Sequence, residues 1–502
     1  MNRAELDGAL KRLESLENRI FCINHAMGLL NVDHETIAPA DASAGIGRTL
    51  ACLGEFLYET TGNQEAKQLL ADLSAERDRL DPATARRVYL LNKDAERRSK
   101  IPQEEQTAMT ILLNEVAVVW KKAKATNDFA LLVPYFEKVL ETTVRFTGYT
   151  DPGMDPYNAL LNQYEEGLST DMLDPFFESL RQAIVPLLHR CMEKGQIDNS
   201  FLHKEYPIAG QRIFSDYLME KIGVDKNRCI LGETEHPFTS GFSSKDVRIT
   251  TNYGLYDISD NMYSVIHEGG HAMYEMNVNP DYDYTSLAGG ASMSIHESQS
   301  RFYENLIGRS RPFIESIFPD VQRFFPEQLE GVTAEMFYRA VNRTEPSLIR
   351  TEADELTYCL HIMVRYELEK ELVAGRLAVK DLPAAWNAKY QEYLGISVPD
   401  DTHGVLQDMH WPNGLIGYFP SYALGSAYGA QMLHFMEQDI PDLWTEVRHG
   451  NLAPVHGWLR EHIHQYGALY APTELFEKAC GKFDPKYYID YLTRKYESLY
   501  GI

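Results

Sequence analysis

The sequence of 502 residues has few cysteines, no long apolar run and a shortage of basic residues. Its six cysteines include no CxxC pair, so neither a disulfide framework nor a thiolate metal site is expected. No stretch approaches the roughly 18 uninterrupted apolar residues of a membrane-spanning helix. The opening segment, MNRAELDGALKRLESLENRI, lacks the apolar core of a secretory signal. These absences predict a cytoplasmic protein with reduced, mostly buried thiols.

The charge balance is strongly acidic. The chain has 73 acidic and 48 basic residues, a formal net charge of −25 and a pI near 5.1. A field of this sign repels phosphate groups, so we expect neither nucleic acid nor an anionic membrane surface as a partner. The 44% of hydrophobic residues is ordinary for a globular protein and excludes collagen-like and mainly disordered chains.

Apolar residues recur every three or four positions through most of the chain, which predicts a mainly α-helical protein. Such patterns cover 6–20, 67–81, 84–98, 104–125, 170–193 and 361–374. Only residues 228–256 combine β-branched and aromatic residues with turn-formers, and they predict a small sheet of two or three strands. Because no repeat, linker or composition shift divides the chain, we expect one large helical body over 1–502.

A pair of histidines follows the predicted sheet in the stretch YDISDNMYSVIHEGGHAMYEMN. Asp257, Ser259 or Asp260 can cap a helix there. On such a helix His267 and His271 stand four residues apart, one turn from each other on the same face. Two imidazoles so placed can bind one Zn²⁺.

Three further features favour a catalytic metal. Glu268 stands between the histidines, beside the expected ion. Gly269 and Gly270 cost about 1 kcal/mol each inside a helix, so we expect another backbone or a substrate to approach closely there. Downstream, SIHESQSRFYENLIG predicts a second helix, capped by a serine and ended by Gly308, that could bring Glu297 to the histidines. Two histidines and one glutamate leave a coordination position open for water.

Simpler interpretations exist for each of these residues. A histidine on an apolar helix face is often a hydrogen-bonded core residue, and a helix glutamate is often only solvated. A structural zinc is the remaining alternative, but structural sites are usually closed by four protein ligands, often cysteines, and no cysteine is near. We therefore predict a catalytic centre in which His267, His271 and Glu297 hold one Zn²⁺ and Glu268 is the general base.

These residues also carry a family likeness. HEGGH at 267–271, followed by HESQS at 296–300, resembles the carboxypeptidase Taq family of metallocarboxypeptidases. Further segments that resemble motifs of the family, in the expected order, are HPF (236–238), DVRIT (246–250), IRTEAD (349–354) and GVLQDMHW (404–411). PYNALLNQYEEG and the closing FDPKYYIDYLTRKY are also similar to family segments, so the likeness covers most of the chain.

The resemblance implies a mainly α, neurolysin-like gluzincin fold with a deep active-site groove. The N-terminal helices, about 1–150, would cover that groove, and the metal and substrate motifs would occupy about 230–425. It also implies a homodimer that removes single C-terminal residues from peptides with broad specificity. Zinc is the expected metal, with cobalt as the alternative.

A segment rich in turn-formers and aromatics, DMHWPNGLIGYFPSY, is typical of a loop that lines a substrate site. The oxyanion of the reaction needs a hydrogen-bond donor besides the metal. Related gluzincins use a histidine and a tyrosine downstream of the metal helix. The resemblance therefore makes His410, Tyr418 and Tyr422 candidate catalytic residues, although a tyrosine in a chain with 30 of them is more often a packing residue.

An arginine is the natural receptor for a terminal carboxylate. Arg350 is the first candidate, with an ion pair to Asp354 as the alternative. Arg248 is a second candidate, for which a structural salt bridge is the alternative. His236 could shape the closed end of the groove, or belong to an ordinary turn. Gln407 and Asp408 could orient a metal ligand.

Two rival functions stay open. An oligopeptidase or dipeptidyl carboxypeptidase would use the same metal chemistry on the same helical scaffold but release other products. A non-catalytic helical protein could keep the metal for stability alone, although Glu268 would then have no use. Metal removal would separate these classes, because a structural metal supports folding whereas a catalytic metal mainly supports activity.

Overall fold

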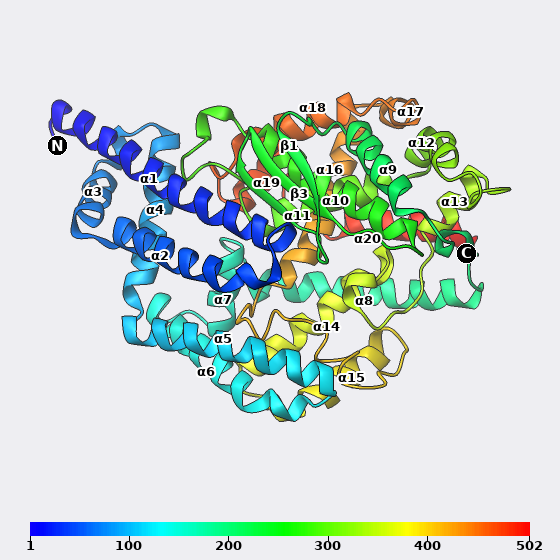
Figure 1. Cartoon of the computed structure of the whole chain (residues 1–502), viewed down its shortest axis with the longest axis horizontal. Coiled ribbons are helices and arrows are strands. Elements are labelled where there is room, and N and C mark those ends of the chain that lie inside the picture. The colour runs from blue at the N-terminus through cyan, green and yellow to red at the C-terminus, as the bar shows by residue number, and fades with distance from the viewer.

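The computed structural model describes residues 1–502 and confirms the mainly α fold class. Helices hold 69% of the residues, and the only sheet has three strands. The two termini lie at opposite ends of the molecule (Figure 1). None of the helices combines the length and the apolar character needed to cross a bilayer.

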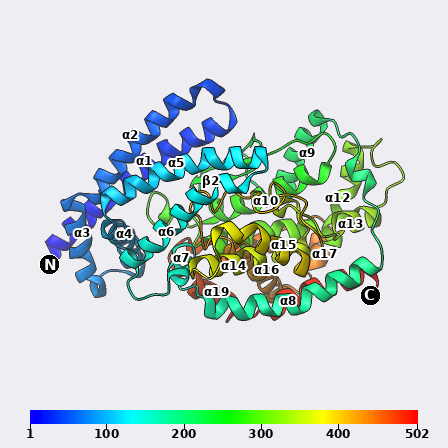
Figure 2. The ribbon, with the colours of Figure 1, turned by 90° about the horizontal axis from the view of Figure 1, so that it is seen from below.

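The first four N-terminal helices pack mainly on one another, whereas the next two also contribute to the large apolar core described below. In chain order, these helices are α1 (Arg3–Thr36), α2 (Ser43–Gly62), α3 (Gln64–Ala75), α4 (Pro82–Lys100), α5 (Gln103–Thr126) and α6 (Val133–Thr150). Leucines spaced along α1 and α3, such as Leu13 and Leu73, form with Val88 of α4 a small apolar cluster of their own. The α1–α2 hairpin projects from the rest of the molecule (Figure 2), and no residue of α2 is buried.

The predicted sheet consists of β1 (Cys229–Glu233), β2 (Thr239–Ser243) and β3 (Asp246–Thr251). The strand order is β1-β3-β2; β3 is parallel to β1 and antiparallel to β2. Thr239 of β2 pairs with Ile249 of β3, which is buried. The sheet packs on α10 (Ile258–Asn277) through β2 and β3.

Helix α10 begins after Asp257, whose side chain accepts hydrogen bonds from the main-chain N–H groups of Ser259 and Asp260. It contacts α11 (Met293–Arg301), which is capped by Ser292 and continues directly into a π-helix, η6 (Phe302–Gly308). The predicted caps and the predicted end at Gly308 are thus confirmed. On its other side α11 packs against α16 (Pro420–Asp439).

A large cluster of buried apolar side chains extends from Val116 in α5 to Tyr500 near the C-terminus. It ties together α7 (Pro156–Tyr164), α8 (Thr170–Glu193), α9 (Ile208–Lys221), α12 (Arg311–Phe324), α13 (Ala334–Val341), α14 (Glu355–Val373), α15 (Leu382–Tyr393), α17 (Leu443–Arg448), α18 (Ala453–His462), α19 (Pro472–Cys480) and α20 (Lys486–Tyr500). This core surrounds α10, the helix that carries the histidine pair.

Candidate metal centre and active site

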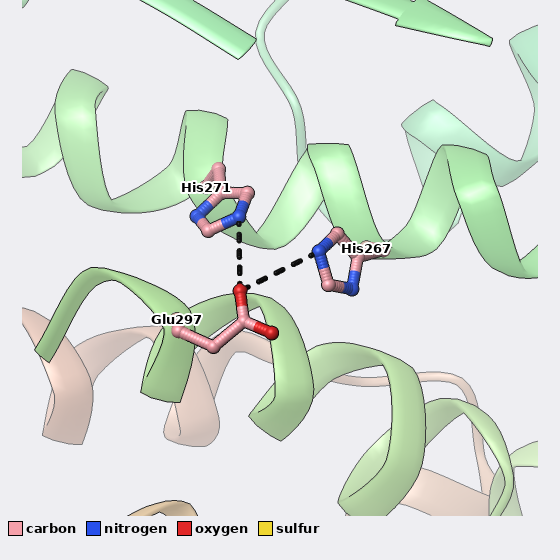
Figure 3. Close-up of side chains that lie close together, drawn as sticks. All are labelled: His267, His271 and Glu297. Carbon is pink, nitrogen blue, oxygen red and sulfur yellow. Dashed lines mark ion pairs between the residues drawn. The ribbon is translucent and has the colours of Figure 1, made fainter. Parts of the chain in front are cut away.

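Three potential metal ligands converge between α10 and α11. Glu297 Oε2 lies 3.7 Å from Nε2 of His267 and 3.6 Å from Nε2 of His271. The imidazoles extend from α10, and the carboxylate extends from α11 toward them (Figure 3). The ligand atoms all lie within 4.8 Å of one another. The structure therefore brings together the residues that the motif predicted.

The other ring nitrogens of the histidines are held by neighbouring side chains. His267 Nδ1 lies 2.8 Å from Glu304 Oε2, and His271 Nδ1 lies 2.6 Å from His296 Nδ1. His296 Nε2 in turn lies 2.7 Å from Glu275 Oε1. If each ring donates its proton outward along this chain, both Nε2 atoms keep a lone pair toward Glu297. Such outer contacts are what fixes the orientation of metal-binding histidines.

The charges around these atoms also suit a cation. Arg301 Nε donates to Glu297 Oε1 at 2.8 Å, which leaves Oε2 facing the histidines. Burial raises the pKa of Glu297, but Arg301 and His267 outweigh it and lower this pKa below its usual range. Burial lowers the pKa of His271 to about 3, so its imidazole is neutral at pH 7. Two imidazole nitrogens and one carboxylate oxygen match the donor set of a catalytic Zn²⁺ site.

The two helices approach closely because a glycine faces a backbone. A Cβ atom on Gly270 would lie 2.7 Å from the carbonyl oxygen of Gln299 in α11. On the opposite side of α11, a Cβ on Gly425 of α16 would lie 2.7 Å from Cβ of Glu297. The expected close backbone approach is confirmed at Gly270, whereas Gly269 faces the side chain of Ile222.

Replacing Gly270 by alanine should therefore loosen the centre. The new methyl group meets a main-chain oxygen that cannot rotate away, so α10 and α11 must separate. We expect Gly270→Ala to lose about 1–3 kcal/mol of stability, less any gain in helix propensity, and to bind metal more weakly. Gly269→Ala is the matched control, because its methyl group meets only the flexible end of Ile222. Equal thermal unfolding and equal metal titration for the two variants would refute this explanation.

Glu268 faces the sheet side of the centre and is 6% exposed. Its carboxylate accepts a hydrogen bond from the hydroxyl of Thr239 on β2. Burial raises the pKa of Glu268 above its usual value. A carboxylate held in one orientation next to the ligand cluster has the position that a general base needs.

The loop before α16 carries His410 and Tyr418, and the first turn of α16 carries Tyr422, so three predicted residues come together. His410 Nε2 lies 3.4 Å from the hydroxyl of Tyr422, and the rings of Tyr418 and Tyr422 are 5.2 Å apart. Burial and, next, the charge of Arg350 lower the pKa of His410 to about 4, so this imidazole is neutral at pH 7. Burial, supported by the charge of Glu297, raises the pKa of Tyr418 to about 12. All three groups keep a proton to donate at neutral pH.

Arg350 is 7% exposed and forms an ion pair with Asp408 of this loop. Its Nη2 and Nε donate to Asp408 Oδ1 at 2.9 and 3.1 Å, and its Cζ lies 5.1 Å from the ring centre of Tyr422. Asp354 caps α14 instead and accepts from Thr357 and its neighbours, so the alternative pair between Arg350 and Asp354 is wrong.

Gln407 and Asp408 do not contact a metal ligand, so the suggestion that they orient one is also wrong. Gln407 Oε1 accepts from the main-chain N–H of Arg350 at 2.9 Å and from Arg365 Nη2 at 2.8 Å. Asp408 pairs with both Arg350 and Arg365. Their role in the structure is to hold two buried guanidinium groups.

The remaining predicted residues lie at the sheet. Arg248 on β3 pairs with Asp246 at 2.6 Å and is 31% exposed. It lines a cavity of about 1070 Å³ between the end of α1 and strands β1 and β3. His236 is exposed in the connection between β1 and β2. The salt bridge proposed as the alternative for Arg248 is thus present, and a place beside a cavity is present too.

Several residues of the centre were not predicted, namely Glu275, His296, Arg301, Glu304 and Arg365. A partial signal existed, because His296 belongs to HESQS and Arg301 and Glu304 follow Glu297 by one and two turns. Arg365 lies in an ordinary charged stretch, and nothing in its spacing marks it.

Comparison with known proteins gives one consistent result. The family model described as carboxypeptidase Taq (M32) metallopeptidase matches residues 12–496. Carboxypeptidase 1 of Bacillus subtilis (strain 168) is 39% identical over 492 residues, which cover 98% of each chain. Thermostable carboxypeptidase 1 of Pyrococcus furiosus is 34% identical and covers 97% of this chain and 98% of its own. The crystal structure of an M32 carboxypeptidase from Deinococcus radiodurans R1 superposes with a TM-score of 0.96 at 37% identity, covering 99% of this chain and 100% of that one.

Proposed function

The chain belongs to the carboxypeptidase Taq (M32) family of metallopeptidases and is a metallocarboxypeptidase, and we propose that it releases single C-terminal residues from peptides with broad specificity. The observation that supports this most directly is the convergence of His267, His271 and Glu297 beside the buried Glu268. The resemblance seen in the sequence is confirmed at the level of family, fold and class of reaction.

The family requires a metal, and we propose one Zn²⁺ per chain, with Co²⁺ as the alternative. His267 Nε2, His271 Nε2 and Glu297 Oε2 would hold it. A metal bound there would supply Lewis-acid chemistry, since it acidifies water and polarises a carbonyl group. Three protein ligands leave room for water and substrate, which a four-ligand structural site does not.

Glu268 is the general base in this proposal. Its carboxylate takes a proton from the attacking water and later delivers it to the amine that leaves. The hydrogen bond from Thr239 keeps the carboxylate from rotating away between these two steps. His410, Tyr418 and Tyr422 donate hydrogen bonds to the oxyanion that forms on the scissile carbonyl.

Arg350 is the proposed receptor for the terminal carboxylate of the peptide. Two guanidinium groups, Arg350 and Arg365, share one carboxylate, Asp408, so the cluster keeps one positive charge. A buried, uncompensated positive charge favours an anionic substrate group. Arg248 and His236 are proposed to contact the peptide further along the sheet, where Arg248 lines the large cavity.

Replacing Arg350 by methionine tests that role. We expect kcat/KM for peptides with a free C-terminus to fall about 10- to 100-fold, because a charge-assisted hydrogen bond of about 1.5–3 kcal/mol is lost. The affinity for the amidated peptide, measured as competitive inhibition, should change less because that peptide has no terminal carboxylate. Arg248→Met is the matched comparison, since Arg248 also pairs with an aspartate but lies at the sheet. Equal losses in kcat/KM for the free peptide and in affinity for the amidated peptide would remove Arg350 from carboxylate binding.

We further propose a single domain over 1–502 whose N-terminal helices, about 1–150, cover the substrate groove. The protein is proposed to be cytoplasmic and homodimeric, with peptides that have a free C-terminus as substrates and neither nucleic acid nor a membrane as a partner. The net charge of −25 supports the last two points.

The decisive experiment uses two peptides of one sequence, one with a free C-terminus and one amidated. Products are identified by mass spectrometry with and without a chelator. Stepwise loss of single residues from the free peptide only, abolished by the chelator, is the expected result. Dipeptide release or internal cuts in both peptides would assign the centre to an oligopeptidase. No cleavage after reloading with zinc or cobalt would leave a non-catalytic metal protein.

A further inference from the structure

A fully buried carboxylate lies outside the centre described above. Glu369, on α14, is 0% exposed, and its three hydrogen-bond donors are all uncharged. Oε2 accepts from the hydroxyl of Tyr157 at 2.8 Å and from the main-chain N–H of Gly417 at 3.0 Å. Oε1 accepts from Nε1 of Trp411 at 2.7 Å. A carboxylate buried in a core without a cation among its hydrogen-bond donors is costly, so its retention calls for an explanation.

Two of the three donors belong to the loop that carries His410 and Tyr418. Trp411 directly follows His410, and Gly417 directly precedes Tyr418. Gly417 has φ of +89°, and a Cβ there would lie 3.1 Å from the main-chain carbon of Leu160. The loop therefore turns at a position open only to glycine, and that turn directs its N–H group at Glu369.

Helix α14 holds the same loop at a second point. Arg365, one turn before Glu369, donates from Nε to Asp408 Oδ2 at 2.6 Å and from Nη2 to Gln407 Oε1 at 2.8 Å. Residues four apart on a helix share one face, so a single face of α14 forms hydrogen bonds with the loop on both sides of His410. Burial raises the pKa of Glu369 to about 7 against the opposing effects of its three donors and of the charge of Arg365. An apolar residue would avoid this cost but leave the N–H groups of Trp411 and Gly417 without acceptors.

We propose that Glu369 is a positioning residue for hydrolysis, which sets the place of His410 and Tyr418 by accepting hydrogen bonds from Trp411 and Gly417. The inference rests on the proposed function, because it assumes that these two groups act in the reaction. It adds a residue outside every motif that carried the family likeness. Its effect is exerted through the loop, since Glu369 itself contacts no metal ligand and lies too deep to meet substrate.

Glu369→Gln tests the proposal with little change in volume. Its amide oxygen can still accept from Tyr157 and Gly417, but its amide N–H groups then oppose the N–H of Trp411. Tyr157→Phe is the matched control, because it removes a donor to the same carboxylate from α7 and leaves both bonds to the loop intact. Trp411→Phe removes the loop bond from the other partner and serves if Glu369→Gln does not fold. For each variant kcat, KM, bound metal and the melting temperature are measured on the cut that the wild type makes.

We expect Glu369→Gln and Trp411→Phe each to lower kcat about 10- to 100-fold at nearly constant KM and full metal content, since small misplacements of catalytic groups have effects of this size. The double variant should lose no more than the larger single loss, because both changes remove one bond. Tyr157→Phe should keep kcat within about twofold. If Glu369→Gln and Tyr157→Phe lower the melting temperature alike and both keep kcat, Glu369 is only structural. Dipeptide release by the wild type would overturn the proposed specificity but not this comparison, which uses whichever bond is cut.

Discussion

Replacing Glu268 by glutamine is expected to leave the metal in place and to lower kcat by about 10²- to 10⁴-fold. Glutamine has nearly the same shape, and its amide oxygen can still accept the hydrogen bond from Thr239. It cannot take a proton from water, however, so the step that generates the nucleophile loses its base. KM should change little, because Glu268 is not proposed to bind the substrate in its ground state.

The measurement pairs steady-state kinetics with metal analysis of the purified variant. Thr239→Val is the matched control, because it keeps the carboxylate of Glu268 and removes only the group that orients it. Its loss in kcat should be much smaller than that of Glu268→Gln. A Glu268→Gln enzyme with turnover within tenfold of wild type would eliminate Glu268 as the general base.

The same substitution at Glu297 should have the opposite effect, namely loss of the metal with the general base intact. Glu297→Gln removes a charged ligand, and we expect metal affinity to fall by more than about 100-fold, beyond the 10- to 100-fold typical of changes around the ligands. The isolated variant should therefore contain little metal and show little activity. Excess Zn²⁺ in the assay should restore part of the activity, because Glu268 is untouched.

Glu304→Gln is the control for that experiment. Glu304 contacts His267 Nδ1 from the outer side, and glutamine there still offers an acceptor oxygen. Its metal affinity should lie between those of wild type and Glu297→Gln when measured by titration against a chelator. Thermal unfolding of the metal-free proteins should show that the fold persists, as expected for a catalytic rather than a structural ion. A Glu297→Gln variant that retains a full complement of metal would exclude Glu297 as a ligand.

Local features were predictable because they depend on residues close in the chain. The spacing of apolar residues predicted helix 170–193 with the bounds that α8 has, and the strand signals located the sheet. The four-residue spacing of His267 and His271 places both on one helix face whatever the surroundings. The position of Glu297 was harder to predict, since its distance from the histidines depends on how α11 packs against α10. The glycines at 269 and 270 indicated a close approach to this helix, and Gly270 does face the backbone of α11.

The sequence by itself thus determined the helical fold class, the histidine pair and the family, because each rests on short-range spacing or on ordered motifs. Only the tertiary structure decided which charges meet. Asp408 pairs with Arg350 and Arg365 rather than serving a metal ligand, and the buried Glu369 holds a loop more than 40 residues away in sequence. Such pairs form where packed helices bring distant side chains together. Carboxylates and guanidinium groups have many possible partners of equal chemistry, so their choice is made by geometry that spacing along the chain does not encode.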